Sequence, residues 1–108
     1  MLTDRVIRIY KKPFLFKKIL LAEIKFGELN NDFCLYATID KEMKLRYKKK
    51  YDKVIRDTIV KLEKMFYEYK TSKFDMREVK EMFYGDMVNT TKFLEKEFGL
   101  QCECYITD

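Results

Sequence analysis

ILLAEIKFGELNNDFCLYATI, at residues 19–39, predicts a β-hairpin. Apolar and polar side chains alternate over residues 20–26, and the alternation resumes over 33–39, which is typical of half-buried strands. In the first strand, one face holds Leu20, Ala22, Ile24 and Phe26, and the other holds Leu21, Glu23 and Lys25. GELNND, at residues 27–32, is rich in turn-forming residues, so we expect a hairpin loop of about five residues there.

A long helix is predicted after the hairpin. Asp40 is a suitable N-cap residue, and apolar side chains recur at helical spacing from Val54 to about Lys70. If this helix begins at Lys41, it is about 44 Å long at a rise of about 1.5 Å per residue. That length exceeds what a domain of this size needs.

A second helix and a final strand follow. Asp75 with Glu78 three residues later is a capping-box pattern that opens a helix, and Gly99 supplies the usual left-handed stop. Residues 100–107 alternate in polarity again. We therefore expect them to form a strand that joins the N-terminal part of the sheet.

The segment Arg5–Lys12 predicts one more strand, because β-branched and aromatic side chains are interleaved with cations. Pro13 offers a β-ladder no donor, so it either ends this strand or confines it to a sheet edge, where the cations of the strand would discourage pairing between molecules. The predicted order is β-β-β-α-α-β within a single domain, 1–108. The fold class is α+β, with an antiparallel sheet packed on a long two-helix hairpin.

The composition predicts a globular protein of the cytoplasm. A chain of 108 residues supports one core, and 47% hydrophobic with 38% charged residues is ordinary for a globular domain. No apolar run approaches the roughly 20 residues that cross a bilayer, and Asp4 stands in an N-terminal stretch without a signal-peptide pattern. Three cysteines, an odd number, also argue against a secreted disulfide framework.

Several chemistries are excluded by what the sequence lacks. With no histidine and only three glycines, the chain cannot form histidine-dependent nucleophile pairs, histidine-ligated metal sites or glycine-rich phosphate loops. Cys102 and Cys104 share a strand face with apolar neighbours, so we expect small buried residues rather than zinc ligands, whereas Cys34 lies on the face opposite Leu35. We predict no catalytic residue, no metal site and no cofactor.

One short pattern resembles a catalytic motif. Glu23 and Lys25 on a strand, with Asp4 upstream, are similar over these few residues to the acid and Glu-x-Lys pattern of restriction-type nucleases. Those enzymes place a helix before the motif strand, and only 22 residues precede Glu23. We interpret the pattern as a charged solvent face.

Positive charge is concentrated in two segments. The net charge of +5 divides into +5 over residues 1–25 and +6 over 41–56, with −3 over 26–40 and −3 over 57–108. RVIRIYKKPFLFKK, at residues 5–18, contains six cations, no acid and three aromatic residues. Such asymmetry bears on the choice of binding partner.

The candidate binding residues are cations for phosphates or carboxylates, with two tyrosines whose rings offer stacking. They are Arg5, Arg8, Lys11, Lys12, Lys44, Arg46, Tyr47, Lys48, Lys49, Lys50, Tyr51 and Lys53. The alternative is a solvated helix end whose tyrosines pack inward, because 18 of the 23 cations are lysine and a lysine-rich chain forms such clusters without a binding role.

These observations favour a small non-catalytic regulatory protein that engages nucleic acid or a nucleoprotein complex. Binding should be largely non-specific and salt-dependent, since no sequence-reading motif is present. One alternative is an inhibitor of the phage or mobile-element kind, which docks on an acidic or nucleic-acid-binding surface of a partner protein. A second is a homodimer formed through apolar side chains near the ends of the first helix. These are Met43, Met65, Phe66, Tyr67, Tyr69 and Phe74.

Overall fold

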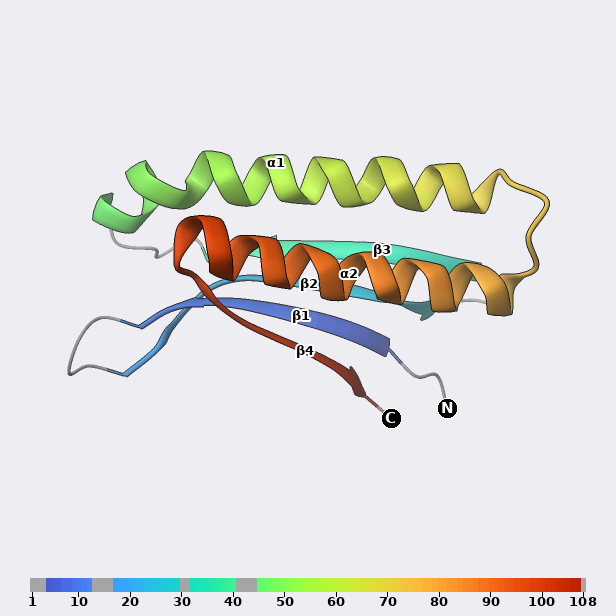
Figure 1. The fold of residues 1–108 in the computed structure, drawn as a ribbon, viewed down its shortest axis with the longest axis horizontal. Coiled ribbons are helices and arrows are strands. Elements are labelled where there is room, and N and C mark those ends of the chain that lie inside the picture. The colour runs from blue at the N-terminus through green and yellow to red at the C-terminus, as the bar shows by residue number, and fades with distance from the viewer. Residues whose placement is uncertain (1–3, 13–16, 30–31, 41–44, 108) are drawn as a thin grey trace.

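The computed structural model describes residues 4–12, 17–29, 32–40 and 45–107. Its elements follow the predicted order, β-β-β-α-α-β (Figure 1). They are β1 (Asp4–Lys11), β2 (Ile19–Leu29), β3 (Asp32–Ile39), α1 (Leu45–Lys70), α2 (Met76–Phe98) and β4 (Gln101–Thr107). The predicted α+β class is confirmed. Among the described residues, no helix is both long enough and apolar enough to span a membrane.

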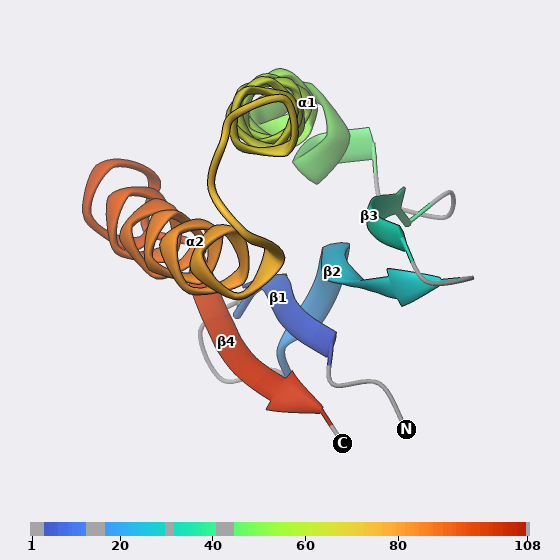
Figure 2. The ribbon, with the colours of Figure 1, turned by 90° about the vertical axis from the view of Figure 1, so that its right-hand side faces the viewer.

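The strands form one antiparallel sheet in the order β3-β2-β1-β4. Both helices pack on the same face of this sheet and leave its other face open (Figures 1 and 2). The edge position expected for β1 is wrong, because β1 pairs with β2 on one side and with β4 on the other. The other expectation, that the strand ends by Pro13, agrees with its last residue, Lys11. Pro13, on which that prediction depended, lies outside the described residues.

A β-bulge in β2 reverses the predicted orientation of two leucines. Ile9 pairs with Ala22, but its neighbour Tyr10 pairs with Leu20, so Leu21 is an extra residue in the ladder. Leu21 is fully buried in the core, and Leu20 is 39% exposed. The strict alternation predicted Leu20 inside and Leu21 outside, and the inserted residue is the reason that it fails.

The β2–β3 hairpin is longer than predicted. Its register continues without a shift through Gly27 opposite Cys34 to Leu29 opposite Asp32, so residues assigned to a loop are strand. Cross-strand backbone bonding thus overrides the weak strand propensity of Gly27. Residues 30–31 lie outside the described part of the chain.

The helix ends follow local sequence signals. Asp75 caps α2, and its carboxylate accepts a hydrogen bond of 2.9 Å from the backbone N–H of Glu78. Gly99 ends α2 with a φ of 65°, the left-handed conformation that glycine adopts without steric cost. Both predictions are confirmed. The predicted start of the first helix, Lys41, falls outside the described residues, and α1 is described from Leu45.

The core lies between the sheet and the two helices. Phe26 of β2 contacts two helix rings, Phe66 at 5.6 Å and Phe83 at 4.7 Å between ring centroids. Around them, β1 and β2 contribute aliphatic side chains, and α1 contributes a stripe that begins at Tyr47. The cluster comprises Ile7, Ile9, Leu21, Ala22, Ile24, Phe26, Tyr47, Tyr51, Ile55, Leu62, Phe66, Phe83, Met87, Leu94 and Leu100.

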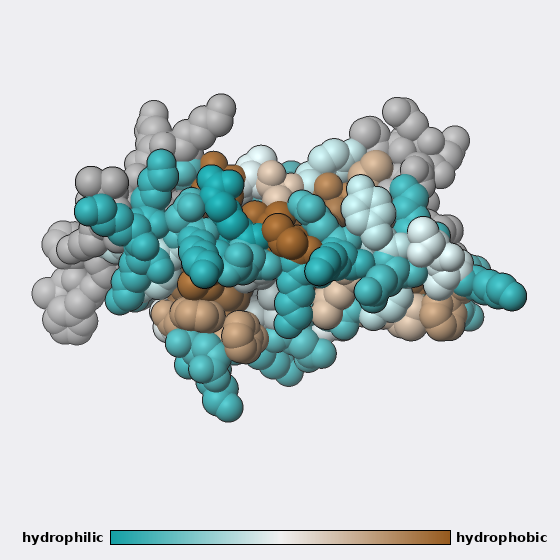
Figure 3. Space-filling model, turned by 90° about the horizontal axis from the view of Figure 1, so that it is seen from above, coloured by the Kyte–Doolittle hydropathy of each residue, from teal (hydrophilic) through white to brown (hydrophobic). Residues whose placement is uncertain are grey.

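Seen from the α1 side, hydrophilic side chains cover most of the molecule, and hydrophobic ones form separate patches (Figure 3). Large exposed apolar residues include Val60, Tyr67, Phe74, Phe93 and Phe98. The chain therefore buries its apolar stripe on one side of each helix and presents a charged surface on the other.

Candidate functional site

The two basic segments meet at one end of the molecule. Lys11, at the end of β1, places its Nζ 5.6 Å from the centre of the Tyr51 ring, and Lys50 of α1 lies 5.4 Å from the same centre. The end of β1, the start of β2 and the start of α1 lie together there (Figure 1). We call this region the lysine end and define it as Lys11, Lys12, Lys17, Lys48, Lys49, Lys50 and Lys53.

Helical spacing orients the lysines of α1 outward. Tyr47, Tyr51 and Ile55 are four residues apart and all point into the core, so the lysines between them lie on other sides of the helix. Lys48, Lys49, Lys50 and Lys53 are accordingly exposed. Lys49 and Lys53 are one turn apart and present their charges on the same side of the helix.

The tyrosines of this segment cannot stack on bases. Tyr47 is 5% exposed and Tyr51 only 2%, so the expectation that their rings stack on a ligand is wrong, and the inward packing that the alternative expected for these two rings is confirmed. A sequence signal for this existed, because the apolar stripe of α1 extends back from Ile55 to Tyr51 and Tyr47 at the same spacing. Lys17 is a further exposed cation that the candidate list omitted.

The lysine end keeps its positive charge. Asp52 is the acid nearest in sequence to its α1 lysines, and its carboxylate is bound by Nε of Arg56 at 2.9 Å, one turn along the helix. Within the described part of the chain, none of the seven lysines forms an ion pair. Lys44 lies outside the described residues, and only the backbone of Arg46 is described.

Arg5 and Arg8 do not belong to the lysine end. Arg5 faces the helices, where its side chain is 9% exposed and its guanidinium lies 3.8 Å from Glu81 of α2 and 5.7 Å from the centre of the Tyr84 ring. Arg8 points to the open face of the sheet and binds Glu23 of β2 at 2.7 Å. The expectation that these arginines join a single basic surface is therefore wrong, because alternate positions of a strand point to opposite faces.

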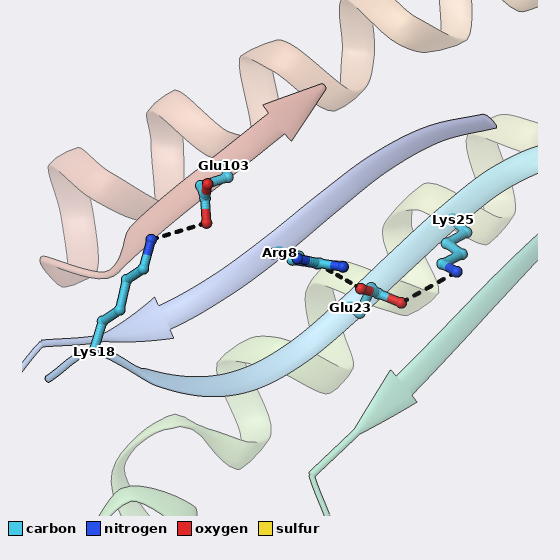
Figure 4. Close-up of polar contacts among 5 residues, drawn as sticks. All are labelled: Arg8, Lys18, Glu23, Lys25 and Glu103. Atoms are coloured by element: carbon cyan, nitrogen blue, oxygen red, sulfur yellow. Dashed lines mark hydrogen bonds and ion pairs between the residues drawn. The ribbon is translucent and has the colours of Figure 1, made fainter. Parts of the chain in front are cut away.

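A network of ion pairs crosses the open face (Figure 4). Arg8 bonds to Glu23, which also lies 3.6 Å from Lys25, and Lys18 bonds to Glu103 of β4 at 3.1 Å. The hydrogen bond from Arg8 to Glu23 raises the pKa of the guanidinium, and hydrogen bonds from Tyr10 and Lys18 lower the pKa of Glu103. Both shifts favour the charged forms of Arg8 and Glu103 near neutral pH. Arg8 of the central strand β1 thus lies opposite a carboxylate on each neighbouring strand, Glu23 of β2 and Glu103 of β4.

This network also accounts for the Glu-x-Lys pattern. Glu23 is engaged by two cations, and Lys25 turns toward Glu23 rather than toward a second carboxylate (Figure 4). No group of three or more Cys, Asp or Glu side chains in the described ranges is arranged to hold a metal ion.

Two of the three thiols are shielded. Cys102 and Cys104 of β4 are partly buried against the core, on the helix-facing side, as expected from their shared strand face. Burial is the main cause that raises the pKa of Cys102 to about 12, and it also raises the pKa of Cys104.

Alkylation should detect this shielding. In a chain with Cys34→Ser and Cys104→Ser, we expect iodoacetamide at pH 8 to modify Cys102 at least about tenfold more slowly than in the same chain unfolded in urea, because the thiolate is the reactive form. Mass spectrometry of timed samples gives both rates. Equal rates in the folded and unfolded chains would contradict the buried position of Cys102.

Compared with protein-family models, with curated proteins and with solved structures, the chain matches none of them. The function must therefore be inferred from the geometry of the site.

Proposed function

We propose that this chain is a non-catalytic nucleic-acid-binding protein that holds phosphates at its lysine end. The observation that supports this proposal is the convergence of Lys11 and Lys50 on the Tyr51 ring, which joins two basic segments that are far apart in sequence. The fold thereby concentrates the positive charge of both segments at one end of the molecule, where a polyanion would meet several lysines at once. The proposal places the protein in the cytoplasm, where nucleic acid is accessible to it.

The composition of the lysine end favours backbone binding without sequence readout. Lysine is a flexible point charge that suits phosphate, whereas the rigid planar groups of arginine and asparagine are better suited to bidentate contacts with base edges. Single-stranded sites usually add aromatic stacking, and the tyrosines of this segment are buried. We therefore infer a preference for a duplex, whose charge density is higher, over a single strand.

The salt dependence of binding tests the proposal. We expect log K for a short DNA duplex to fall linearly with log salt concentration, with a slope of about −0.9 for each phosphate contacted. Replacing Lys49 and Lys53 with glutamine should make that slope shallower by about 1.8 and weaken binding to all sequences alike. Filter binding or fluorescence anisotropy at several salt concentrations measures both quantities.

A matched double variant controls for net charge. Lys64→Gln with Lys73→Gln removes two exposed lysines that lie outside the lysine end and are not ion-paired within the described ranges. It should leave the slope unchanged. Equal losses in the two double variants would show that total charge alone determines binding, and absence of binding at low salt would reject a nucleic-acid partner in favour of an acidic protein surface.

A further inference from the structure

The two edges of the sheet are protected differently. Edge strands normally carry lysine, proline or inward-pointing charge, which prevent pairing between molecules. β3 has no charged residue and no proline from Phe33 to Ile39, in a chain that is 38% charged. The strand expected to protect an edge, β1, is instead at the centre of the sheet. At the other edge, β4 carries Glu103.

The register shows which backbone groups of β3 point outward. The N–H of Asp40 donates to the carbonyl of Leu21 at 2.9 Å. Leu21 and Asp40 are therefore a hydrogen-bonded pair, next to the opposed pair Ala22 and Ile39. Hydrogen-bonded and non-hydrogen-bonded pairs alternate along an antiparallel ladder. The backbone groups of Tyr36 and Thr38 are therefore directed to β2, and those of Leu35, Ala37 and Ile39 are directed to the free edge.

The helices leave this edge accessible. Ala37 lies on the helix-facing side of the sheet but is exposed, and Tyr36 and Thr38 are exposed on the open side. Tyr36 is 44% exposed. Within the described ranges β3 pairs with β2 alone, so an incoming strand would meet a row of backbone donors and acceptors on its other side.

Three of the side chains predicted from the sequence to form a dimer interface pack in or against the core instead. Phe66 is 5% exposed, and Met65 and Tyr69 are packed against the core cluster. Met43 lies outside the described residues. Among the residues named for that surface, Tyr67 and Phe74 are well exposed, and they do not form a strand edge.

We infer that a second copy of this chain pairs with β3, antiparallel to it, to form a continuous eight-stranded sheet. A two-fold axis normal to the sheet would pass between Tyr36 and Tyr36 of the second copy. The helices of both copies would then lie on one face, and the open faces would adjoin. This inference is independent of nucleic-acid binding.

The chemistry of β3 is matched by an identical strand. In this register Cys34 lies opposite Thr38, Leu35 lies opposite Ala37, and the two Tyr36 rings face each other across the axis. These central pairs are uncharged, and aromatic cross-strand pairs contribute favourably to sheet stability, whereas the acidic residues Asp32 and Asp40 meet only at the two ends of the paired strands. A charged peptide would instead place its charges opposite uncharged side chains of β3, where they would have no cross-strand partner. An antiparallel pair about a two-fold axis also closes on itself, so the assembly stops at a dimer.

A charge substitution at the axis tests the dimer. Light scattering at tens of micromolar, without nucleic acid, should give twice the chain mass of 13.3 kDa. Tyr36→Lys would place like charges directly opposite each other, so we expect the dimer dissociation constant to rise at least about tenfold. Tyr67→Lys, at a 62% exposed position on α1, is the matched control and should stay dimeric.

Cross-linking gives an independent readout of the register. Directly opposed residues of a non-hydrogen-bonded antiparallel pair have Cα atoms about 4.5 Å apart, which suits a disulfide. In a Cys34→Ser chain, Tyr36→Cys should therefore form a covalent dimer under mild oxidation, with the link mapped to residue 36 by mass spectrometry. A monomeric mass for the unaltered chain would overturn the inference, as would cross-linking no faster than that of Tyr67→Cys.

Discussion

Replacing Leu21 with alanine is expected to lower the free energy of unfolding by about 2–5 kcal/mol, whereas the same change at Leu20 should cost less than about 1 kcal/mol. The reason is the β-bulge, which turns the fully buried Leu21 into the core and leaves Leu20 at 39% exposure. The two variants differ by one position and remove the same atoms. Urea unfolding followed by circular dichroism measures both free energies.

This pair of variants also separates two descriptions of β2. Simple alternation places Leu20 with Ala22 and Ile24, and it predicts the opposite ranking of the two variants. A larger loss from Leu20→Ala than from Leu21→Ala would mean that Tyr10 pairs with Leu21 and that β2 has no bulge.

Replacing Phe83 with alanine is expected to remove about 3–5 kcal/mol of stability, a large part of the 5–15 kcal/mol typical of a domain. The Phe83 side chain is fully buried, and its ring centroid lies 4.7 Å from that of Phe26 and 5.8 Å from that of Phe66. Truncation would leave a cavity where α1, α2 and the sheet meet, and such cavities are only partly filled by relaxation.

The control for Phe83 is an aromatic residue outside the core. Phe74 is 50% exposed in the connection between the helices, so Phe74→Ala should change the free energy of unfolding by less than about 1 kcal/mol. Denaturant midpoints and slopes for both variants are compared with those of the unaltered chain. Similar small losses in the two variants would contradict the central position of Phe83.

Elements marked by local signals were predictable from the sequence. The second helix was predicted with its cap at Asp75 and its stop at Gly99, because both signals act within one turn of the helix end. The strand character of residues 19–26 was equally clear from its alternation. The order of elements and the α+β class follow from these local patterns.

Features that depend on pairing between distant segments were not predictable in the same way. The central position of β1 depends on β4, and no property of residues 4–11 alone reports it. The bulge could not be predicted from the sequence, because Ile19, Leu20 and Leu21 are all apolar and either leucine could face the core. The observed lysine end lacks two residues of the predicted basic site for a related reason. Arg5 and Arg8 point to opposite faces of β1, and each lies against a carboxylate there.

The place of β1 between β2 and β4 also bears on how the chain folds. The β1–β2 contacts close a short loop, whereas Lys11 and Gln101 are separated by roughly 90 residues, so the β1–β4 ladder carries a much larger entropy of closure. We therefore expect β4 to dock after the hairpin and helices have assembled, which would place its contacts outside the folding nucleus. Destabilising changes in β4 should then accelerate unfolding more than they slow folding.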